Sequence, residues 1–145
     1  MIQRITKEFS FEAAHALDHH QGKCHDIHGH SYHLRITIVG PINTKVGHPE
    51  CGMVMDFGNL KALFVNHIEP LFDHRLILHE RSRFKGIEIS NSRVRFVEYQ
   101  PTCENMLSEI VQLTKEHLTG ATIHSALLRE TPTSYAEWYE QDNRK

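Results

Sequence analysis

Two early segments alternate apolar and polar side chains, and this alternation constrains the fold more than any other feature of the sequence. Because the side chains of a β-strand point alternately to its two faces, the pattern predicts two strands that each bury one face. The segments are Ile5–Ala13 and Ser31–Val39. The apolar positions that share a parity are Ile5, Phe9 and Phe11 in the first segment and Leu34, Ile36 and Ile38 in the second.

Two later segments show the spacing of amphipathic helices. One begins near Asp56, and the other opens at Thr102 and ends at Gly120. Asp56 and Thr102 are suitable N-caps, and a glycine commonly follows a helix. The apolar stripes are Leu60, Leu63, Phe64, Ile68 and Leu71 in the first helix and Leu107, Ile110, Val111 and Leu118 in the second.

Further strands are predicted around these helices. They are Leu76–Leu78, Val94–Tyr99 and Thr122–Glu130. Residues 80–93 are polar and predict a loop or an irregular hairpin, and Ser134–Tyr139 is interpreted as a short aromatic tail. Strand pairs with helices grouped between them favour an α+β fold with an antiparallel sheet.

Composition narrows the function classes. The length of 145 residues suits one domain, residues 1–145. A net charge of −2 and the lack of a long basic run argue against nucleic-acid binding. No apolar stretch approaches the roughly 20 residues of a membrane span, and the first residues carry no signal-peptide pattern. The three cysteines form no CxxC pair, which favours a reducing cytoplasm over a disulfide framework.

A histidine motif predicts a metal site. In an extended Cys24-His25-Asp26-Ile27-His28-Gly29-His30 segment, His28 and His30 point to the same side. His15 continues the inner parity of the first strand and is the third candidate ligand. Three neutral imidazoles leave a fourth position open, as in catalytic zinc sites. Copper would bind such a set more tightly in vitro, and a chance pattern in a chain with 13 histidines is the alternative.

Other polar residues have both a catalytic and a structural interpretation. Cys24 lies in a histidine-rich loop where a cation would favour its thiolate, or it is an inert loop cysteine. In Asp73-His74 the carboxylate can orient the ring if the backbone turns there, or the pair only ends a helix. Glu130 ends the apolar face of a strand, where a buried carboxylate needs a partner such as the N–H edge of a heterocycle. The remaining cysteines, Cys51 and Cys103, have no comparable surroundings and are interpreted as structural.

Taken in order, these pieces resemble the 6-pyruvoyl-tetrahydropterin synthase / 6-carboxytetrahydropterin synthase family. The segments that carry the resemblance are Phe11-Glu12-Ala13-Ala14-His15, Cys24-x3-His28-Gly29-His30-Ser31-Tyr32, Gly52-Met53-Val54-Met55-Asp56-Phe57, Asp73-His74, Pro101-Thr102-Cys103-Glu104-Asn105 and Leu128-Arg129-Glu130-Thr131. One departure is His79, which stands where the family often has asparagine. Residues 80–98 also look like an insertion.

The resemblance implies a role for each matching residue. His15, His28 and His30 would hold Zn²⁺, and Cys24 would remove a proton. Asp73 and His74 would complete a proton relay to Cys24. The residues implied in substrate binding are Glu130, which would bind the amino-oxo edge of the pterin, and Thr102 and Glu104, which would lie near the pterin.

The resemblance also implies a fold and a reaction. The fold would be the tunnelling fold, with two helices on one face of the sheet and subunits that assemble into barrels as trimers or hexamers with active sites between them. The enzyme would be a lyase that acts on 7,8-dihydroneopterin triphosphate. The three-residue gap between Cys24 and His28 resembles that of the 6-carboxytetrahydropterin synthases of queuosine precursor synthesis, which release acetaldehyde and triphosphate. The alternatives are a 6-pyruvoyl-tetrahydropterin synthase and a metal-binding protein without catalysis.

Overall fold

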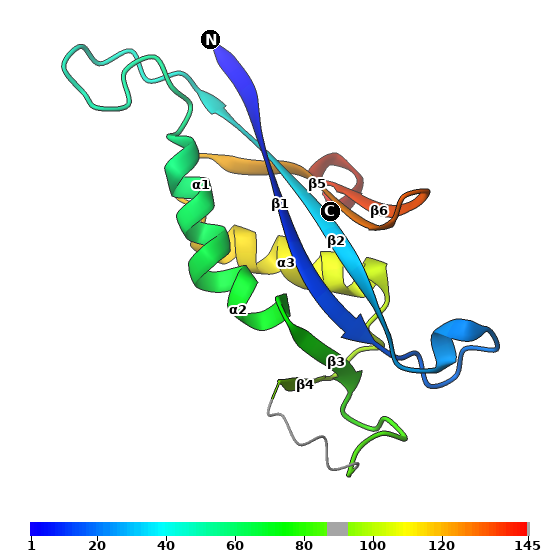
Figure 1. Ribbon diagram of the computed structural model, residues 1–145. Helices are drawn as coiled ribbons and strands as arrows, with labels where there is room; N and C mark the ends of the chain where they lie inside the picture. The colour runs from blue at the N-terminus through cyan, green and yellow to red at the C-terminus, as the bar shows by residue number, and fades with distance from the viewer. Residues whose placement is uncertain (87–92, 145) are drawn as a thin grey trace.

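A six-stranded sheet with helices on one face forms the fold of the computed structural model, which describes residues 1–86 and 93–144 (Figure 1). The strand order is β4-β3-β1-β2-β5-β6. The strands are β1 (Ile2–His15), β2 (His28–Pro41), β3 (Arg75–His79), β4 (Val94–Val97), β5 (Thr122–Thr131) and β6 (Ser134–Tyr139). The α-helices are α1 (Phe57–Leu63), α2 (Glu69–Phe72) and α3 (Cys103–His117), and short 3-10 turns cover Lys23–His25 and Glu140–Asn143.

The long β1–β2 hairpin is antiparallel along its whole length, from the pair Ile2–Pro41 to the pair His15–His28. Its buried positions follow the predicted parity, since Phe11 and Ala13 of β1 face the same side as Leu34 and Ile36 of β2. The strands extend beyond the predicted segments at both ends. The ladder therefore reaches the histidines themselves, and the end of the hairpin sets their positions.

The prediction of an antiparallel sheet is right for four strands and wrong for the other two. β5 pairs antiparallel with β2 and with β6, but β3 pairs parallel with β1, and β4 pairs parallel with β3. The reason is the path of the chain, because the helices return it from the end of β2 to the end of β1, so β3 runs in the direction of β1 (Figure 1). Parallel pairing of β3 and β4 also contradicts a hairpin at residues 80–93, of which 87–92 lie outside the described residues.

The first predicted helix is one helical segment with an irregular middle. Asp56 caps it as expected, accepting a hydrogen bond from the N–H of Gly58 at 2.6 Å. A π-helical turn at Phe64–Ile68 joins α1 to α2. This wider turn ends two residues before Pro70, which has no N–H to donate to the carbonyl group four residues earlier. The segment ends at Phe72, which places Asp73 at the start of the return to the sheet.

Helix α3 packs on β5 and β6. Its cap is Thr102, whose hydroxyl accepts a hydrogen bond from the N–H of Asn105 at 3.3 Å. The helix ends at His117, before the predicted Gly120, which instead takes a positive φ of 77° in the turn to β5. The predicted aromatic tail is the edge strand β6, paired with β5 from Ser134 to Tyr139.

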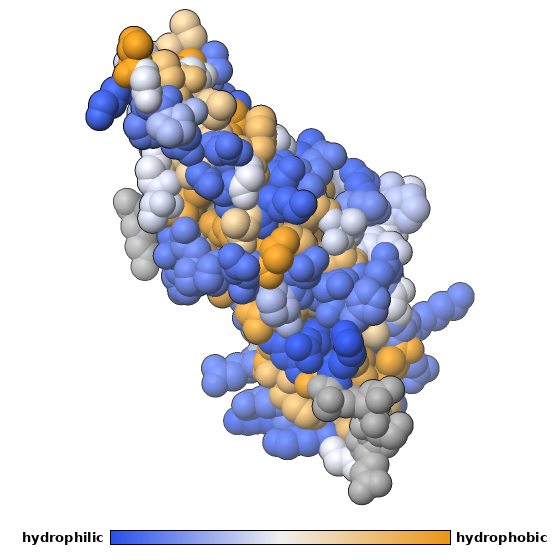
Figure 2. All heavy atoms as spheres, turned by 60° about the vertical axis from the view of Figure 1, so that its left-hand side comes forward, coloured by the Kyte–Doolittle hydropathy of each residue, from blue (hydrophilic) through white to orange (hydrophobic). Residues whose placement is uncertain are grey.

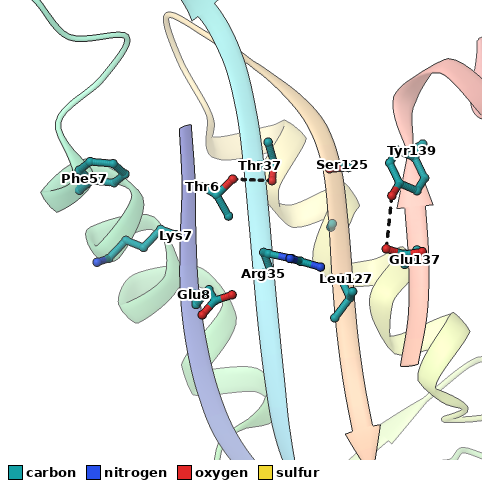
Figure 3. A pocket seen from close by; sticks show the side chains of 11 residues that line it. Thr6, Lys7, Glu8, Arg35, Thr37, Phe57, Ser125, Leu127, Glu137 and Tyr139 are labelled. Carbon is teal, nitrogen blue, oxygen red and sulfur yellow. Dashed lines mark hydrogen bonds between the residues drawn. The ribbon is translucent and has the colours of Figure 1, made fainter. Parts of the chain in front are cut away.

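The other face of the sheet is open and polar. A cavity of about 770 Å³ lies there against β1, β2, β5 and β6, with Thr6, Arg35 and Glu137 in its lining (Figure 3). Within the described residues, its lining contains none of the predicted site residues. The surface in Figure 2 is mainly hydrophilic, with apolar residues in small groups. Among the described helices, none has the length and apolar character needed to cross a membrane.

Candidate metal centre and active site

Three histidines meet at the end of the β1–β2 hairpin. His15 is the last residue of β1 and pairs with His28, the first residue of β2, while His30 pairs with Ala13. All three side chains therefore lie on the face that the helices cover. One ring nitrogen from each histidine lies within 4.8 Å of the other two, and this is the single such group of three within residues 1–86 and 93–144. The structure thus brings together the three residues predicted as ligands.

Gly29 allows the two strands to approach closely at this point. A Cβ atom added to Gly29 would lie 3.3 Å from the carbonyl oxygen of Ala13, which belongs to the backbone and cannot move aside cheaply. Gly29 lies opposite Ala14 in the ladder, between the two histidines of β2. A larger residue would push the strands apart where the imidazoles converge.

Hydrogen bonds to carbonyl groups fix the tautomers of two histidines. His15 Nδ1 lies 2.6 Å from the carbonyl oxygen of Pro101, and His28 Nδ1 lies 2.8 Å from that of Asp26. A carbonyl oxygen only accepts hydrogen bonds, so both Nδ1 atoms carry the proton. In the neutral rings both Nε2 atoms are then unprotonated, and they face each other at 3.0 Å. Two lone pairs at this distance repel unless a cation lies between them.

The third histidine, His30, also has a ring nitrogen without a hydrogen-bond partner among the described residues. This nitrogen, Nε2, is buried. Burial is the main influence that lowers the pKa values of His15 and His30, so both rings favour the neutral form that binds metals. Three imidazoles with converging nitrogens suit a metal ion.

A carboxylate lies beside this cluster. Glu130 Oε1, near the end of β5, is 3.5 Å from His15 Nε2 and 3.7 Å from His30 Nε2. The buried hydroxyl of Tyr32 donates a hydrogen bond to the same oxygen at 3.1 Å. Burial, together with the charge of Glu130, raises the pKa of Tyr32 and keeps the phenol protonated as the donor. Sequence reasoning assigned no role to Tyr32, because only the β2–β5 pairing brings it to Glu130.

A cavity of about 310 Å³ connects most of the predicted site. Five predicted residues line it, and they come from four separate segments of the chain. These residues are His15, Cys24, Thr102, Glu104 and Glu130. Residues of β6 complete the lining, although the sequence indicated only a tail there.

Cys103 lines the same cavity. The sequence had indicated no surroundings for it comparable to those of Cys24. Its Sγ lies 3.2 Å from the carbonyl oxygen of Leu128. Burial raises the pKa of this thiol to about 11, so it stays protonated near neutral pH. Cys24 is more exposed, on the 3-10 turn between the strands. Cys103 thus lies near the site without the properties of a base.

Asp73 and His74 form a pair at a different place in the fold. Asp73 Oδ2 lies 2.8 Å from His74 Nδ1, and a φ of 55° at His74 supplies the turn that adjacent residues need to face each other. Both residues bind the backbone of Glu12: Asp73 Oδ1 accepts from its N–H, and the His74 N–H donates to its carbonyl. His74 lines a cavity of about 490 Å³ with Glu12 and His30, whereas the described lining of the Cys24 cavity includes neither Asp73 nor His74.

His79 makes a turn contact of the kind that asparagine makes. Its Nδ1 accepts a hydrogen bond from the N–H of Arg81, two residues later, at 3.0 Å. An asparagine side chain offers a comparable acceptor to the backbone two residues on. The departure from the common family residue therefore leaves this turn intact.

The family model for 6-pyruvoyl tetrahydropterin synthase matches residues 4–141 of the chain. The chain belongs to the 6-pyruvoyl tetrahydropterin synthase family. It is an enzyme of that family. Its relatives include proteins named 6-carboxy-5,6,7,8-tetrahydropterin synthase. The one from Haemophilus influenzae is 36% identical over 142 residues, which cover 94% of this chain and 99% of the relative. The one from a Synechocystis species is 38% identical over 136 residues, covering 93% and 92% of the two chains.

Solved structures agree on the fold of this member of the 6-pyruvoyl tetrahydropterin synthase family. An uncharacterized protein from Wolinella succinogenes superposes with a TM-score of 0.75 at 21% identity, covering 97% of this chain and 99% of the other. The 6-pyruvoyl tetrahydropterin synthase of Caenorhabditis elegans gives 0.69 at 23% identity, covering 96% of each chain. The chain therefore has the tunnelling fold, with a mixed sheet in place of the fully antiparallel one expected.

Proposed function

We propose that this chain is a zinc-dependent lyase that converts 7,8-dihydroneopterin triphosphate to 6-carboxy-5,6,7,8-tetrahydropterin, a step of queuosine precursor synthesis. One observation carries the proposal: a single cavity is lined by His15 of the histidine cluster, by Cys24 and by Glu130. The names of the relatives from Haemophilus influenzae and Synechocystis support the same product. With the match to residues 4–141, we infer that the whole chain acts as one domain.

His15, His28 and His30 would hold the zinc ion through their Nε2 atoms. The all-imidazole set suits zinc, and its fourth position would be open to substrate. When bound, zinc would supply Lewis-acid stabilisation of negative charge on the side-chain oxygens of the substrate. The carbonyl groups of Pro101 and Asp26 would keep the two Nε2 atoms turned toward the ion by holding the Nδ1 protons.

Glu130 would orient the substrate. One of its oxygens already accepts from Tyr32, and a heterocycle with adjacent N–H donors would bind the carboxylate in a bidentate manner. Thr102 and Glu104 line the same cavity and would contact the ring. The thiolate of Cys24 would take a proton from the side chain of the bound pterin, and His74, paired with Asp73, would return protons.

The overall reaction balances with one water molecule. The bond from the terminal side-chain carbon to the triphosphate oxygen breaks, and a carbon–carbon bond of the side chain breaks to give acetaldehyde. The remaining side-chain carbon becomes the carboxylate, and the ring gains the hydrogens that convert the dihydro to the tetrahydro state. The side chain is oxidised and the ring is reduced, so no external oxidant is required.

Product analysis tests the proposal. The zinc-loaded protein is incubated with 7,8-dihydroneopterin triphosphate, and the pterin is identified by mass spectrometry alongside assays for acetaldehyde and triphosphate. We expect the carboxy product with acetaldehyde. Triphosphate release with 6-pyruvoyl-tetrahydropterin and no acetaldehyde would assign the other branch, which the description of the family model favours. No triphosphate release at all would leave a metal-binding protein without catalysis.

We further propose that the active site forms between subunits of a homo-oligomer, a trimer or hexamer in the cytoplasm. The supporting observation is that Cys24 and His74 line two different cavities of one subunit. Two inactive variants, Cys24→Ala and His74→Ala, are mixed, unfolded and refolded together. If each site combines residues from two chains, random assortment returns about a quarter of the wild-type activity. No recovery from a mixture that refolds and assembles fully would contradict a shared site.

A further inference from the structure

Most hydrogen bonds within the loop that carries Cys24 join residues two or three positions apart. The loop runs through residues 16–27, from the end of β1 to the start of β2. The N–H of Leu17 donates to the carbonyl of Cys24 at 2.9 Å and closes the neck of the loop, and His20 donates back to Leu17 at 3.0 Å. The other internal bonds, from His25 to Gly22, from Asp26 to Lys23 and from Gly22 to His20, join residues two or three positions apart, so the attachment of the loop to the rest of the chain depends on contacts from elsewhere.

Those contacts come from the segment after β3, which sequence reasoning could describe only as an insertion. The Ser82 hydroxyl and the Arg83 backbone N–H each donate to Asp18 Oδ1 at 3.0 Å. The guanidinium Nη2 of Arg83 donates to the carbonyl of His25 at 2.7 Å and to Asp26 Oδ1 at 2.8 Å. Asp18 lies at the start of the loop and Asp26 at its end. We call Ser82 and Arg83 the clasp, because together they bind both ends of the loop.

Burial supports an ordered clasp at its Asp18 end, whereas at the other end the Arg83 and Asp26 side chains are 41% and 80% exposed. Ser82 is only 4% exposed, and the Asp18 side chain is 10% exposed. The guanidinium of Arg83 also lies 3.9 Å from Asp18 Oδ1 and packs 4.4 Å from the ring centre of Phe84. It therefore faces two carboxylates and a carbonyl group at once. The planar fork of arginine can make several such bonds, whereas lysine presents a single point charge.

The clasp reaches the candidate site by two short routes. The bonded carbonyl belongs to His25, the residue directly after Cys24. The bonded carboxylate belongs to Asp26, whose backbone carbonyl accepts the Nδ1 proton of His28. One guanidinium thus connects, through two neighbouring residues, to the thiol on one side and to a metal-site imidazole on the other.

We propose that Arg83 is a positioning residue of this enzyme, holding the Cys24 thiol and the His28 imidazole in their relative positions through His25 and Asp26. The inference rests on the proposed function, in which Cys24 removes a proton from a substrate bound at the histidine cluster. Arg83 touches no reacting atom in this scheme. Its loss should therefore reduce turnover more than substrate binding, because Glu130 and the rest of the pterin site stay in place.

Steady-state kinetics of the zinc-loaded enzyme test the catalytic part. A displacement of about 1 Å can cost roughly 100-fold in rate, so Arg83→Ala should lower kcat about 10- to 100-fold while KM stays within about twofold. Arg81→Ala is the matched control, because the Arg81 side chain is 85% exposed and pairs only with Glu80 among the described residues. The control should keep the wild-type kcat. A wild-type kcat in Arg83→Ala would overturn the proposal.

Hydrogen–deuterium exchange of the loop peptides tests the clasp without using activity. Amides of residues 17–26 should exchange faster in Arg83→Ala than in the wild type or in Arg81→Ala. Unchanged exchange would refute the clasp even if kcat fell. If the wild-type enzyme releases no triphosphate, the proposed function fails and the catalytic part fails with it, but exchange still decides whether Arg83 holds the loop. If Arg83→Ala does not fold, Arg83→Lys and Arg83→Gln replace it, and equal kcat and exchange in both variants and the wild type would overturn the proposal.

Discussion

Replacing His30 with glutamine should remove most of the zinc-linked stability of this protein and leave the metal-free protein almost unchanged. His30 Nε2 is buried and has no hydrogen-bond partner among the described residues, so the metal-free protein loses little when the ring is replaced. His15 and His28 each hold a carbonyl group through Nδ1, and their loss would also break a structural bond. The His30 variant therefore separates metal binding from folding.

The geometry indicates that the His15–His28 pair needs little rearrangement to bind the ion. Two nitrogens at 2.0–2.1 Å from a tetrahedral zinc lie about 3.3–3.4 Å apart. The Nε2 atoms of His15 and His28 are 3.0 Å apart, so for this pair a movement of a few tenths of an ångström is enough. At free zinc of about 1,000 times the dissociation constant, binding stabilises the native state by about 4 kcal/mol. For a chain of this length that corresponds to a rise in Tm of about 8–16 °C.

Removing one of three ligands should weaken zinc binding at least as much as removing a hydrogen-bond partner of a ligand, which lowers metal affinity by up to about 100-fold. A 100-fold loss is about 2.7 kcal/mol, so the zinc-induced rise should shrink by about 5–11 °C. Thermal unfolding is followed with buffered zinc and with chelator. His33→Gln is the control, since His33 lies on the same strand but is exposed on the other face, and it should keep the full rise. An equal zinc response in both variants would show that the three imidazoles do not share an ion.

Three further predictions address the other site residues. Cys24→Ala should keep zinc and pterin binding and lose turnover; retained triphosphate release would remove the thiol from the mechanism. Glu130→Ala should weaken pterin binding about 10- to 150-fold, the value of a hydrogen bond to a charged group, and calorimetry that finds an unchanged Kd would reject its binding role. Asp73→Asn should destabilise the metal-free protein by about 1 kcal/mol at neutral pH. Burial alone would raise the pKa of Asp73, but hydrogen bonds from Glu12 and His74 hold this pKa below its usual value. The stability that Asp73 contributes is therefore present above the unfolded-state pKa and is lost as pH falls through the folded-state pKa. Urea unfolding should show the two proteins converging in acid, and a pH-independent difference would contradict this origin.

The local patterns of the sequence predicted what depends on neighbouring residues. Alternation placed Phe11 and Leu34 on the covered face, and the caps at Asp56 and Thr102 begin helices as expected. The convergence of the three histidines also followed from strand parity, because the β1–β2 hairpin places the end of one strand against the start of the next.

Contacts between distant segments could not be predicted in the same way. The parallel pairing of β3 depends on where the helices return the chain, and period-two alternation is the same in parallel and antiparallel strands. The bonds from Arg83 to Asp26 and from Tyr32 to Glu130 join residues 57 and 98 positions apart, and no local pattern marks either pair. Cys103 reaches the cavity only because α3 packs on β5.

The pair His15–His28 is the last rung of the β1–β2 ladder, next to the loop of residues 16–27 that connects the two strands. An ion shared by these two rings would cross-link the two strands at this end of the hairpin. It would oppose their separation at the point where the loop that carries Cys24 begins. Departure of the metal would then loosen the hairpin from this end, and the thiol would lose its fixed position in the same event. Loss of the metal ion and loss of a correctly positioned Cys24 base would then occur together.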